Sequence, residues 1–181
     1  MTLAFAAGLA LAGCGGSGSG GGQTQAPDYD AALRDAPAKL AAVYDQQNQL
    51  LDGGLDAFEQ RVASLRGHPV VVNNWAEWCG NCRLEFPIFQ RVSARDGDRV
   101  AFLGVDSNDS ADAAKGFLDE YPVPYPSFFD PDWNISDQAL PGTRGLPKTA
   151  FYDSSGRRVH VHFGPYESDQ DLQADIDRYA R

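Results

Sequence analysis

The stretch that decides the fold is "WAEWCGNCRLEFP", residues 75–87, in which two residues separate a pair of cysteines. It continues the short β-branched run "PVVVNNWA", which is typical of a buried central strand. Leu84, Ile88 and Val92 then recur at helical spacing. Cys79 is therefore expected where the strand gives way to a helix, with Cys82 one turn inside that helix. Such a pair is a redox pair, two metal ligands or a structural disulfide.

A metal site and a purely structural disulfide both explain the pair poorly. A four-ligand zinc site normally needs a second Cys/His pair at a comparable spacing. His68, His160 and His162 are the histidines of the chain, and the last two alternate on "RVHVHF", a face that we expect to be solvated. We therefore expect no metal here. A bridge that closes so short a loop also constrains the unfolded chain very little, so stabilisation alone does not account for it.

A redox pair has a direct physical basis. Free backbone N–H groups and the helix dipole stabilise a thiolate at a helix N-terminus, and the thiolate is the attacking species. Cys79 is thus expected to be the exposed nucleophile. Cys82, deeper in the helix, is expected to resolve the mixed disulfide.

Bulk composition limits the other possibilities. With 181 residues and 43% hydrophobic content, the chain is long enough for one domain of ordinary size. The formal net charge is -10 and the basic residues are scattered, so we expect no nucleic-acid partner, which would need a clustered positive face.

The N-terminal segment indicates export. Residues 1–14, "MTLAFAAGLALAGC", are too short to span a bilayer and are typical of a secretory signal segment. "LAGC" resembles the bacterial lipobox, which implies that Cys14 is lipidated and anchors the chain to a membrane. The Gly/Ser-rich residues 15–27 then predict a flexible tether. We therefore expect an extracytoplasmic, membrane-anchored lipoprotein.

The remaining chain predicts a helical extension at 28–66 and an α/β domain at 67–181. The extension shows two helical faces, formed by Leu40, Val43, Tyr44, Gln47 and Leu51 and then by Leu55, Phe58, Val62 and Leu65. In the domain, a buried strand at 99–106 precedes a helix that Ser110 caps. A short strand near Phe128, a helical turn, a hairpin around "SSG" and a closing helix complete a mixed sheet.

These motifs together resemble the thioredoxin-like proteins. "WAEWCGNC" follows the signature Trp-Ala-x-Trp-Cys-x-x-Cys, and "GLP" at 145–147 lies where that family has its cis-proline. The resemblance covers residues 67–181. It implies a central mixed sheet flanked by helices, a cis Pro147 that faces the cysteines, and a substrate-facing rim that includes Trp78 and Leu146.

Within that family, the chain resembles the TlpA/ResA-type branch of membrane-tethered thiol–disulfide oxidoreductases. The resemblance rests on Asn73 in place of a buried Asp, on "Cys-x-x-Glu-x-Pro" from Cys82 to Pro87, and on a long insertion at 107–140. Glu85, three residues after Cys82, shares a helix face with it, so its carboxylate is expected beside the cysteines. There it would raise the thiol pKa values by charge repulsion or exchange protons with Cys82, although an ordinary solvated glutamate fits the same spacing. The branch reduces disulfides of exported proteins, including apocytochrome c, with electrons from an upstream membrane or extracytoplasmic donor. The Cys79–Cys82 disulfide is then the redox group, and no further cofactor is expected.

Two other functions stay open on the residues alone. Gly80 and Asn81 replace the more usual dipeptide that contains proline, which leaves open an oxidant that donates disulfides. A copper-binding or assembly lipoprotein on the same fold usually has Cys-x-x-x-Cys, a spacing one residue longer than here. Trp75 is expected in the core, and Lys148 is expected to be solvated.

Overall fold

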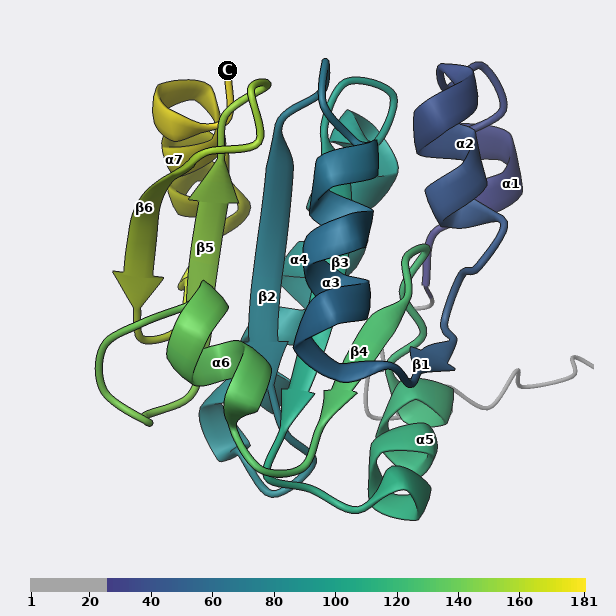
Figure 1. Ribbon diagram of the computed structural model, residues 1–181. Helices are drawn as coiled ribbons and strands as arrows, with labels where there is room; N and C mark the ends of the chain where they lie inside the picture. The colour runs from purple at the N-terminus through teal and green to yellow at the C-terminus, as the bar shows by residue number, and fades with distance from the viewer. Residues whose placement is uncertain (1–25) are drawn as a thin grey trace, which may run out of the picture.

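A six-stranded mixed sheet in the order β1-β4-β3-β2-β5-β6 forms the centre of the computed structural model, which describes residues 26–181 (Figure 1). The strands are β1 (Leu50–Leu51), β2 (Val70–Trp75), β3 (Ala101–Ser107), β4 (Ser127–Asp130), β5 (Lys148–Tyr152) and β6 (Arg158–Phe163). Strands β1 to β4 pair in parallel, whereas β5 is antiparallel to both of its neighbours. The mixed sheet and the hairpin predicted from the sequence are both confirmed.

Helices cover both faces of this sheet. They are α1 (Tyr29–Ala32), α2 (Ala38–Tyr44), α3 (Gly54–Ser64), α4 (Gly80–Asp96), α5 (Ala111–Glu120), α6 (Asn134–Ala139) and α7 (Asp169–Tyr179). Figure 1 shows α3 and α6 in front of the sheet and α4 and α7 behind it. α5 packs against α4, with the rings of Phe117 and Phe86 at 4.7 Å. No helix within residues 26–181 is long and apolar enough to cross a membrane.

The central strand β2 lies between these helical layers. All six of its residues are buried, and Val70, Val71 and Val72 have no exposed surface. Strands covered on both faces are expected to be continuous apolar runs, which is how this segment reads. Trp75, at the end of the strand, stacks on Phe117 at 4.8 Å and has no exposed surface, so the prediction that Trp75 belongs to the core is confirmed.

Several local predictions hold at single residues. Ser110 caps α5, and its side chain accepts a hydrogen bond from the Ala113 N–H. The short strand near Phe128 is β4, and the predicted helical turn after it is α6. The closing helix is α7, which begins after Ser168.

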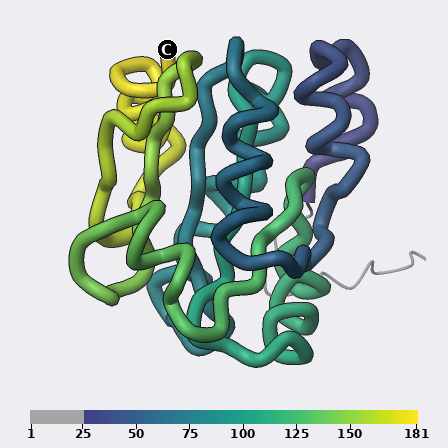
Figure 2. Tube along the Cα trace, in the orientation of Figure 1, coloured from purple at the N-terminus to yellow at the C-terminus, as the bar shows by residue number. Residues whose placement is uncertain are grey.

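The segment that precedes β2 is helical in part and also contributes a strand. α1 and α2 lie at one edge of the molecule, opposite the C-terminal helix (purple and yellow in Figure 2). The Tyr44 hydroxyl ties α2 to the sheet by donating to the Val100 carbonyl at 2.9 Å. The assignment of Leu51 to a helical face was wrong. Leu50 and Leu51 form β1, which pairs with β4. Without β1, the backbone N–H and C=O groups on that edge of β4 would have no strand partner.

Candidate active site

The two cysteines of the motif form a disulfide at the junction of β2 and α4. Cys79 is the N-cap of α4, and its sulfur accepts a hydrogen bond from the Cys82 N–H at 3.1 Å. The Cys79–Cys82 disulfide is present, and both residues are buried, with 5% of Cys79 and none of Cys82 exposed. Cys79 is therefore the more accessible sulfur, although it is less exposed than the sequence suggested. The structure describes the oxidised form of the pair.

The side chain of Glu85 points inward from α4 and is completely buried. Its Oε1 accepts a hydrogen bond from the Asn73 side-chain amide at 2.7 Å, and its Oε2 accepts one from the Tyr166 backbone N–H at 3.1 Å. Burial raises the pKa of Glu85 to about 8, although both donors favour the carboxylate and oppose that rise. The solvated interpretation of Glu85 is therefore wrong, because β2 and the β6–α7 loop close over the carboxyl group.

The proline of "GLP" immediately precedes β5, the strand that pairs with β2. The Leu146–Pro147 peptide bond is cis, as the resemblance implies. Lys148, which follows it, pairs with Asn74 of β2, so Pro147 lies at the end of the sheet that carries the cysteines. The Pro147 carbonyl accepts a hydrogen bond from the Gly164 N–H at 3.1 Å. Leu146 is half-buried and Pro147 is buried.

The loop after β3 supports the motif in a way that the sequence did not reveal. Asp109 accepts a hydrogen bond from the Glu77 N–H at 2.6 Å, and the Asn108 carbonyl accepts one from the Trp78 indole at 2.9 Å. Below this loop, Asp106 is fully buried, and neither of its carboxylate oxygens has a hydrogen-bond donor. Burial first, and then the charge of nearby Asp109, raise the pKa of Asp106 to about 8.

Comparison with known proteins identifies the family. Residues 24–157 match the model of the AhpC/TSA family, which is most of the chain. This chain belongs to the AhpC/TSA family.

Related sequences are named as proteins of thiol–disulfide exchange. A thiol:disulfide interchange protein DsbE homolog of Paracoccus denitrificans (strain Pd 1222) is 38% identical over 75% of each chain. The thiol-disulfide oxidoreductase ResA of Halalkalibacterium halodurans is 26% identical over 71% of this chain and 73% of its own length. The chain covers only 51% of DsbE of Pseudomonas fluorescens biotype C, at 36% identity. The predicted class of enzyme is confirmed, and this AhpC/TSA-family chain is a thiol–disulfide oxidoreductase.

Solved structures agree with the thioredoxin-like fold. DsbF of MTB superposes with a TM-score of 0.57 at 32% identity, over 64% of this chain and 83% of that one. The exposed lipoprotein thioredoxin Etrx1 of Streptococcus pneumoniae strain TIGR4 gives 0.55 at 25% identity, over 64% of this chain and 89% of that one. The predicted fold class is therefore confirmed.

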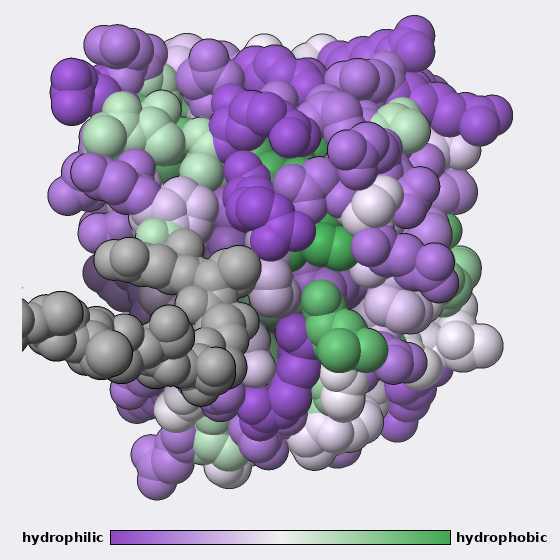
Figure 3. All heavy atoms as spheres, turned by 180° about the vertical axis from the view of Figure 1, so that it is seen from behind, coloured by the Kyte–Doolittle hydropathy of each residue, from purple (hydrophilic) through white to green (hydrophobic). Residues whose placement is uncertain are grey.

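Exposed apolar side chains of this AhpC/TSA-family protein gather in part around the motif. Seen from behind, the surface is mostly hydrophilic with separate hydrophobic spots (Figure 3). Among the described residues the large exposed hydrophobic side chains are Trp78, Leu84, Val159 and Phe163. The first two belong to the motif itself, with 52% of Trp78 and 71% of Leu84 exposed. An exposed apolar rim beside a disulfide is suited to contact with a polypeptide substrate.

Lys148 was wrongly expected to be solvated. Only 1% of the residue is exposed, and its Nζ donates to the Ser136 hydroxyl at 2.8 Å and to the Leu140 carbonyl at 2.9 Å. Burial lowers the pKa of Lys148. The two oxygen acceptors belong to α6 and to Leu140, which follows it. The lysine therefore connects this segment to the start of β5, next to the cis-proline.

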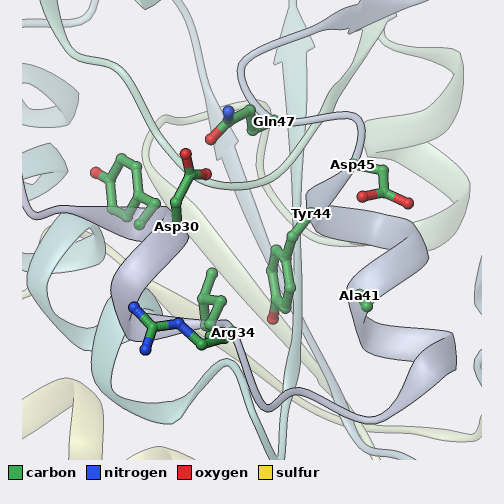
Figure 4. Close-up of a pocket in the computed structure, with 8 residues that line it drawn as sticks. Asp30, Arg34, Ala41, Tyr44, Asp45 and Gln47 are labelled. Carbon is green, nitrogen blue, oxygen red and sulfur yellow. The ribbon is translucent and has the colours of Figure 1, made fainter.

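Cys14, the predicted lipidation residue, lies outside the described residues. His160 and His162 are half-buried rather than solvated, and each stacks on a tyrosine ring. A pocket of about 250 Å³ between α1 and α2 is lined by side chains such as Tyr44 and Arg34 and contains none of the predicted site residues (Figure 4).

Proposed function

We propose that this oxidoreductase is an exported, lipid-anchored reductase of protein disulfides. The observation that carries the proposal is the arrangement on α4, in which the Cys79 sulfur caps the helix and the buried Glu85 lies one turn beyond Cys82. The first feature stabilises an attacking thiolate at Cys79, and the second supplies a proton acceptor on the same helix as Cys82. The relatives named thiol-disulfide oxidoreductase ResA and thiol:disulfide interchange protein DsbE homolog support thiol–disulfide exchange as the class of reaction.

The reaction consists of two thiol–disulfide exchanges. In the reduced enzyme, the Cys79 thiolate attacks one sulfur of the substrate disulfide, forms a mixed disulfide and releases the other substrate sulfur as a thiolate. Cys82 then loses its proton and attacks the Cys79 sulfur, which releases the second substrate thiolate. The Cys79–Cys82 disulfide of the described structure is the product. Two electrons pass to the substrate, and a thiol donor must return two electrons to the pair before the next turnover.

Glu85 is suited to the proton transfer of the second exchange. Its pKa of about 8 in the oxidised form lies close to the ordinary pKa of a cysteine thiol, about 8.5. A proton then moves between the two groups with little free-energy cost in either direction. Asn73 has no basic group, and it acts by donating its hydrogen bond to the Glu85 carboxylate.

The cellular setting follows from the N-terminal segment and the named relatives. The "LAGC" at Cys14 and the Gly/Ser-rich tether support a lipid anchor that leaves the folded part free to reach exported proteins. The exposed lipoprotein thioredoxin of Streptococcus pneumoniae, which is similar in structure, supports the same setting. Apocytochrome c, whose thiols must be reduced before haem attaches, is the substrate that we expect first. The electron donor is a membrane or extracytoplasmic thiol protein, and the disulfide pair needs no further cofactor.

The experiment that tests this function separates the two cysteines. Cys79→Ser should abolish reduction of a disulfide-containing apocytochrome c peptide, because the attacking sulfur is gone. Cys82→Ser should retain the first exchange and accumulate a mixed disulfide, which non-reducing gels and mass spectrometry detect. Full turnover by either variant would contradict the two-cysteine mechanism. Accumulation of the mixed disulfide on Cys79→Ser instead would reverse the two roles.

A further inference from the structure

The loop between β6 and α7 provides one of the two hydrogen bonds that Glu85 accepts. The donor is the backbone N–H of Tyr166, which lies 81 residues from Glu85 in sequence, at 3.1 Å from Oε2. A backbone N–H is only as well placed as its loop, which is held by the Tyr166 side chain and by the bond from the Gly164 N–H to the Pro147 carbonyl. Only 4% of Tyr166 is exposed, so the contacts of its side chain are almost entirely with protein.

Three side chains contact the Tyr166 ring. Phe89 of α4 packs against it edge-on, with the ring centroids 6.2 Å apart. The other two form with it what we call the Tyr166 cluster: Tyr166, His162 and Asp175. The phenol donates to Oδ2 of Asp175 in α7 at 2.8 Å. The ring stacks on His162 of β6 at 4.2 Å, with 17° between the planes. Nδ1 of His162 lies 3.5 Å from the same Asp175 oxygen. One carboxylate therefore contacts both members of the stack, which connects the last strand, the loop and the last helix.

A second pair on the same elements provides an internal comparison. His160, two residues earlier on β6, stacks on Tyr179 of α7 at 4.0 Å and 15°, a geometry close to that of the His162–Tyr166 stack. The Tyr179 ring also lies against Phe151 of β5, at 5.8 Å. The His160–Tyr179 stack packs α7 against the sheet. Tyr179 donates no hydrogen bond to Glu85, whose carboxyl group accepts its two bonds from Asn73 and Tyr166. Of the two stacks, the one in the Tyr166 cluster is connected to the buried acid.

We propose that His162, Asp175 and the Tyr166 ring are positioning residues for Glu85, which hold the loop N–H on its carboxyl group. The proposal rests on the proton-transfer role given to Glu85 in the proposed function. It assigns the three residues no contact with the reacting sulfurs. Their effect reaches the cysteines only through the hydrogen bond that Glu85 accepts.

The groups around Glu85 determine the direction of the expected effect. β2 contributes the neutral Asn73, the β6–α7 loop contributes the Tyr166 N–H, and the buried phenol of Tyr125 lies close enough for its pKa to respond to the Glu85 charge. The Tyr166 N–H favours the carboxylate. Weakening it must therefore raise the pKa of Glu85 above about 8.

The charges around the cluster affect the pKa of Glu85 in the opposite direction to the loss of positioning. A direct effect of charge can therefore be told apart from an effect of positioning. His162 is faced by Asp175 and Asp171 of α7 and by His160 of its own strand. A pocket of about 390 Å³ exposes part of this cluster to solvent, so substitutions there are expected to be tolerated. Removal of the negative charge of Asp175 would favour the Glu85 carboxylate and lower its pKa, whereas loss of positioning raises it.

The test is a direct titration of Glu85 in the oxidised full-length chain. With glutamate labelled at the side-chain carboxyl carbon, ¹³C NMR follows each carboxyl group against pH, and the signal missing from Glu85→Gln identifies Glu85. Glu85 is the one buried glutamate in residues 26–181. Tyr166→Phe retains the ring and removes the phenol bond without changing the charge. We expect the Glu85 midpoint to rise by about one pH unit, the scale of one hydrogen bond to a charged group.

Three matched variants complete the design. Asp175→Leu removes the acceptor and should also raise the midpoint. Asp175→Asn retains an acceptor but loses the charge, so it should leave the midpoint at or slightly below the wild-type value. His160→Gln changes the comparable stack and should have no effect. An unchanged midpoint in both Tyr166→Phe and Asp175→Leu, or a fall in Asp175→Leu, would overturn the proposal. Because the titration needs no turnover, this result is independent of whether the chain reduces protein disulfides.

Discussion

The site contains two buried carboxyl groups whose surroundings differ, although burial raises the pKa of each to about 8. Both oxygens of Glu85 accept hydrogen bonds, whereas neither oxygen of Asp106 has a donor. Glu85 lies on the cysteine helix. Asp106 lies on β3, below the loop that holds Glu77 and Trp78. The two groups therefore differ in their partners: two donors support the Glu85 carboxylate, whereas no donor among the described residues supports that of Asp106.

The largest expected effect distinguishes the two groups by kinetics. Glu85→Gln should slow the resolution of the mixed disulfide by about a hundred-fold at pH 7, because general acid–base catalysis contributes on the order of 10² or more. Asp106→Asn should change that rate by less than about twofold, since Asp106 lies on β3 and not on the cysteine helix. Stopped-flow tryptophan fluorescence, followed from pH 5 to pH 9, measures the step.

The pH dependence of this step provides the control. The wild-type rate of this step should rise with pH as Glu85 ionises. Glu85→Gln should lose this rising limb of the pH–rate profile, whereas Asp106→Asn should retain it. If Asp106→Asn instead removed the limb, the assignment of the two carboxyl groups would have to be exchanged. An unchanged profile in Glu85→Gln would leave Glu85 without a role in proton transfer.

A smaller effect should appear in stability. Each group has a folded pKa near 8 and an ordinary pKa near 4, so the folded state retains a proton that the unfolded state has lost. The stability contributed by each group is thus fully present below about pH 4 and is lost as the pH rises through about 8. The loss is at most about 1.4 kcal/mol per pH unit and group.

Urea unfolding of the oxidised protein checks this sign. Asp106→Asn should gain about 3 kcal/mol relative to wild type between pH 5 and pH 9, because the variant no longer buries an unpaired charge. Glu85→Gln should gain about as much, since the folded pKa of Glu85 is also about 8 and that value already includes the effect of its two donors. Asp119→Asn, at an exposed position of α5, gives the baseline. Equal gains in all three variants would show that burial of these carboxyl groups has no energetic consequence.

The features that could be predicted from the sequence are those that short segments determine. The strand before Cys79, the helix after it and the cap of α5 at Ser110 all follow from local patterns. The cis bond before Pro147 followed from a resemblance carried by three residues.

The features that were missed depend on contacts between distant segments. The burial of Glu85 depends on Tyr166, 81 residues away, and no periodicity marks that tyrosine. Lys148 was misjudged because its acceptors come from α6 and Leu140. Asp106 lies in an apolar strand whose sequence gives no sign that its carboxyl group lacks a donor.

The reduction potential of the Cys79–Cys82 pair tests the central claim most directly. It is measured from tryptophan fluorescence of the full-length chain equilibrated in thiol redox buffers, since Trp75 and Trp78 flank the disulfide. A reductase of exported protein disulfides should give a value near that of thioredoxin, about -270 mV. A value near that of DsbA, about -120 mV, would contradict the account and make this chain a donor of disulfides.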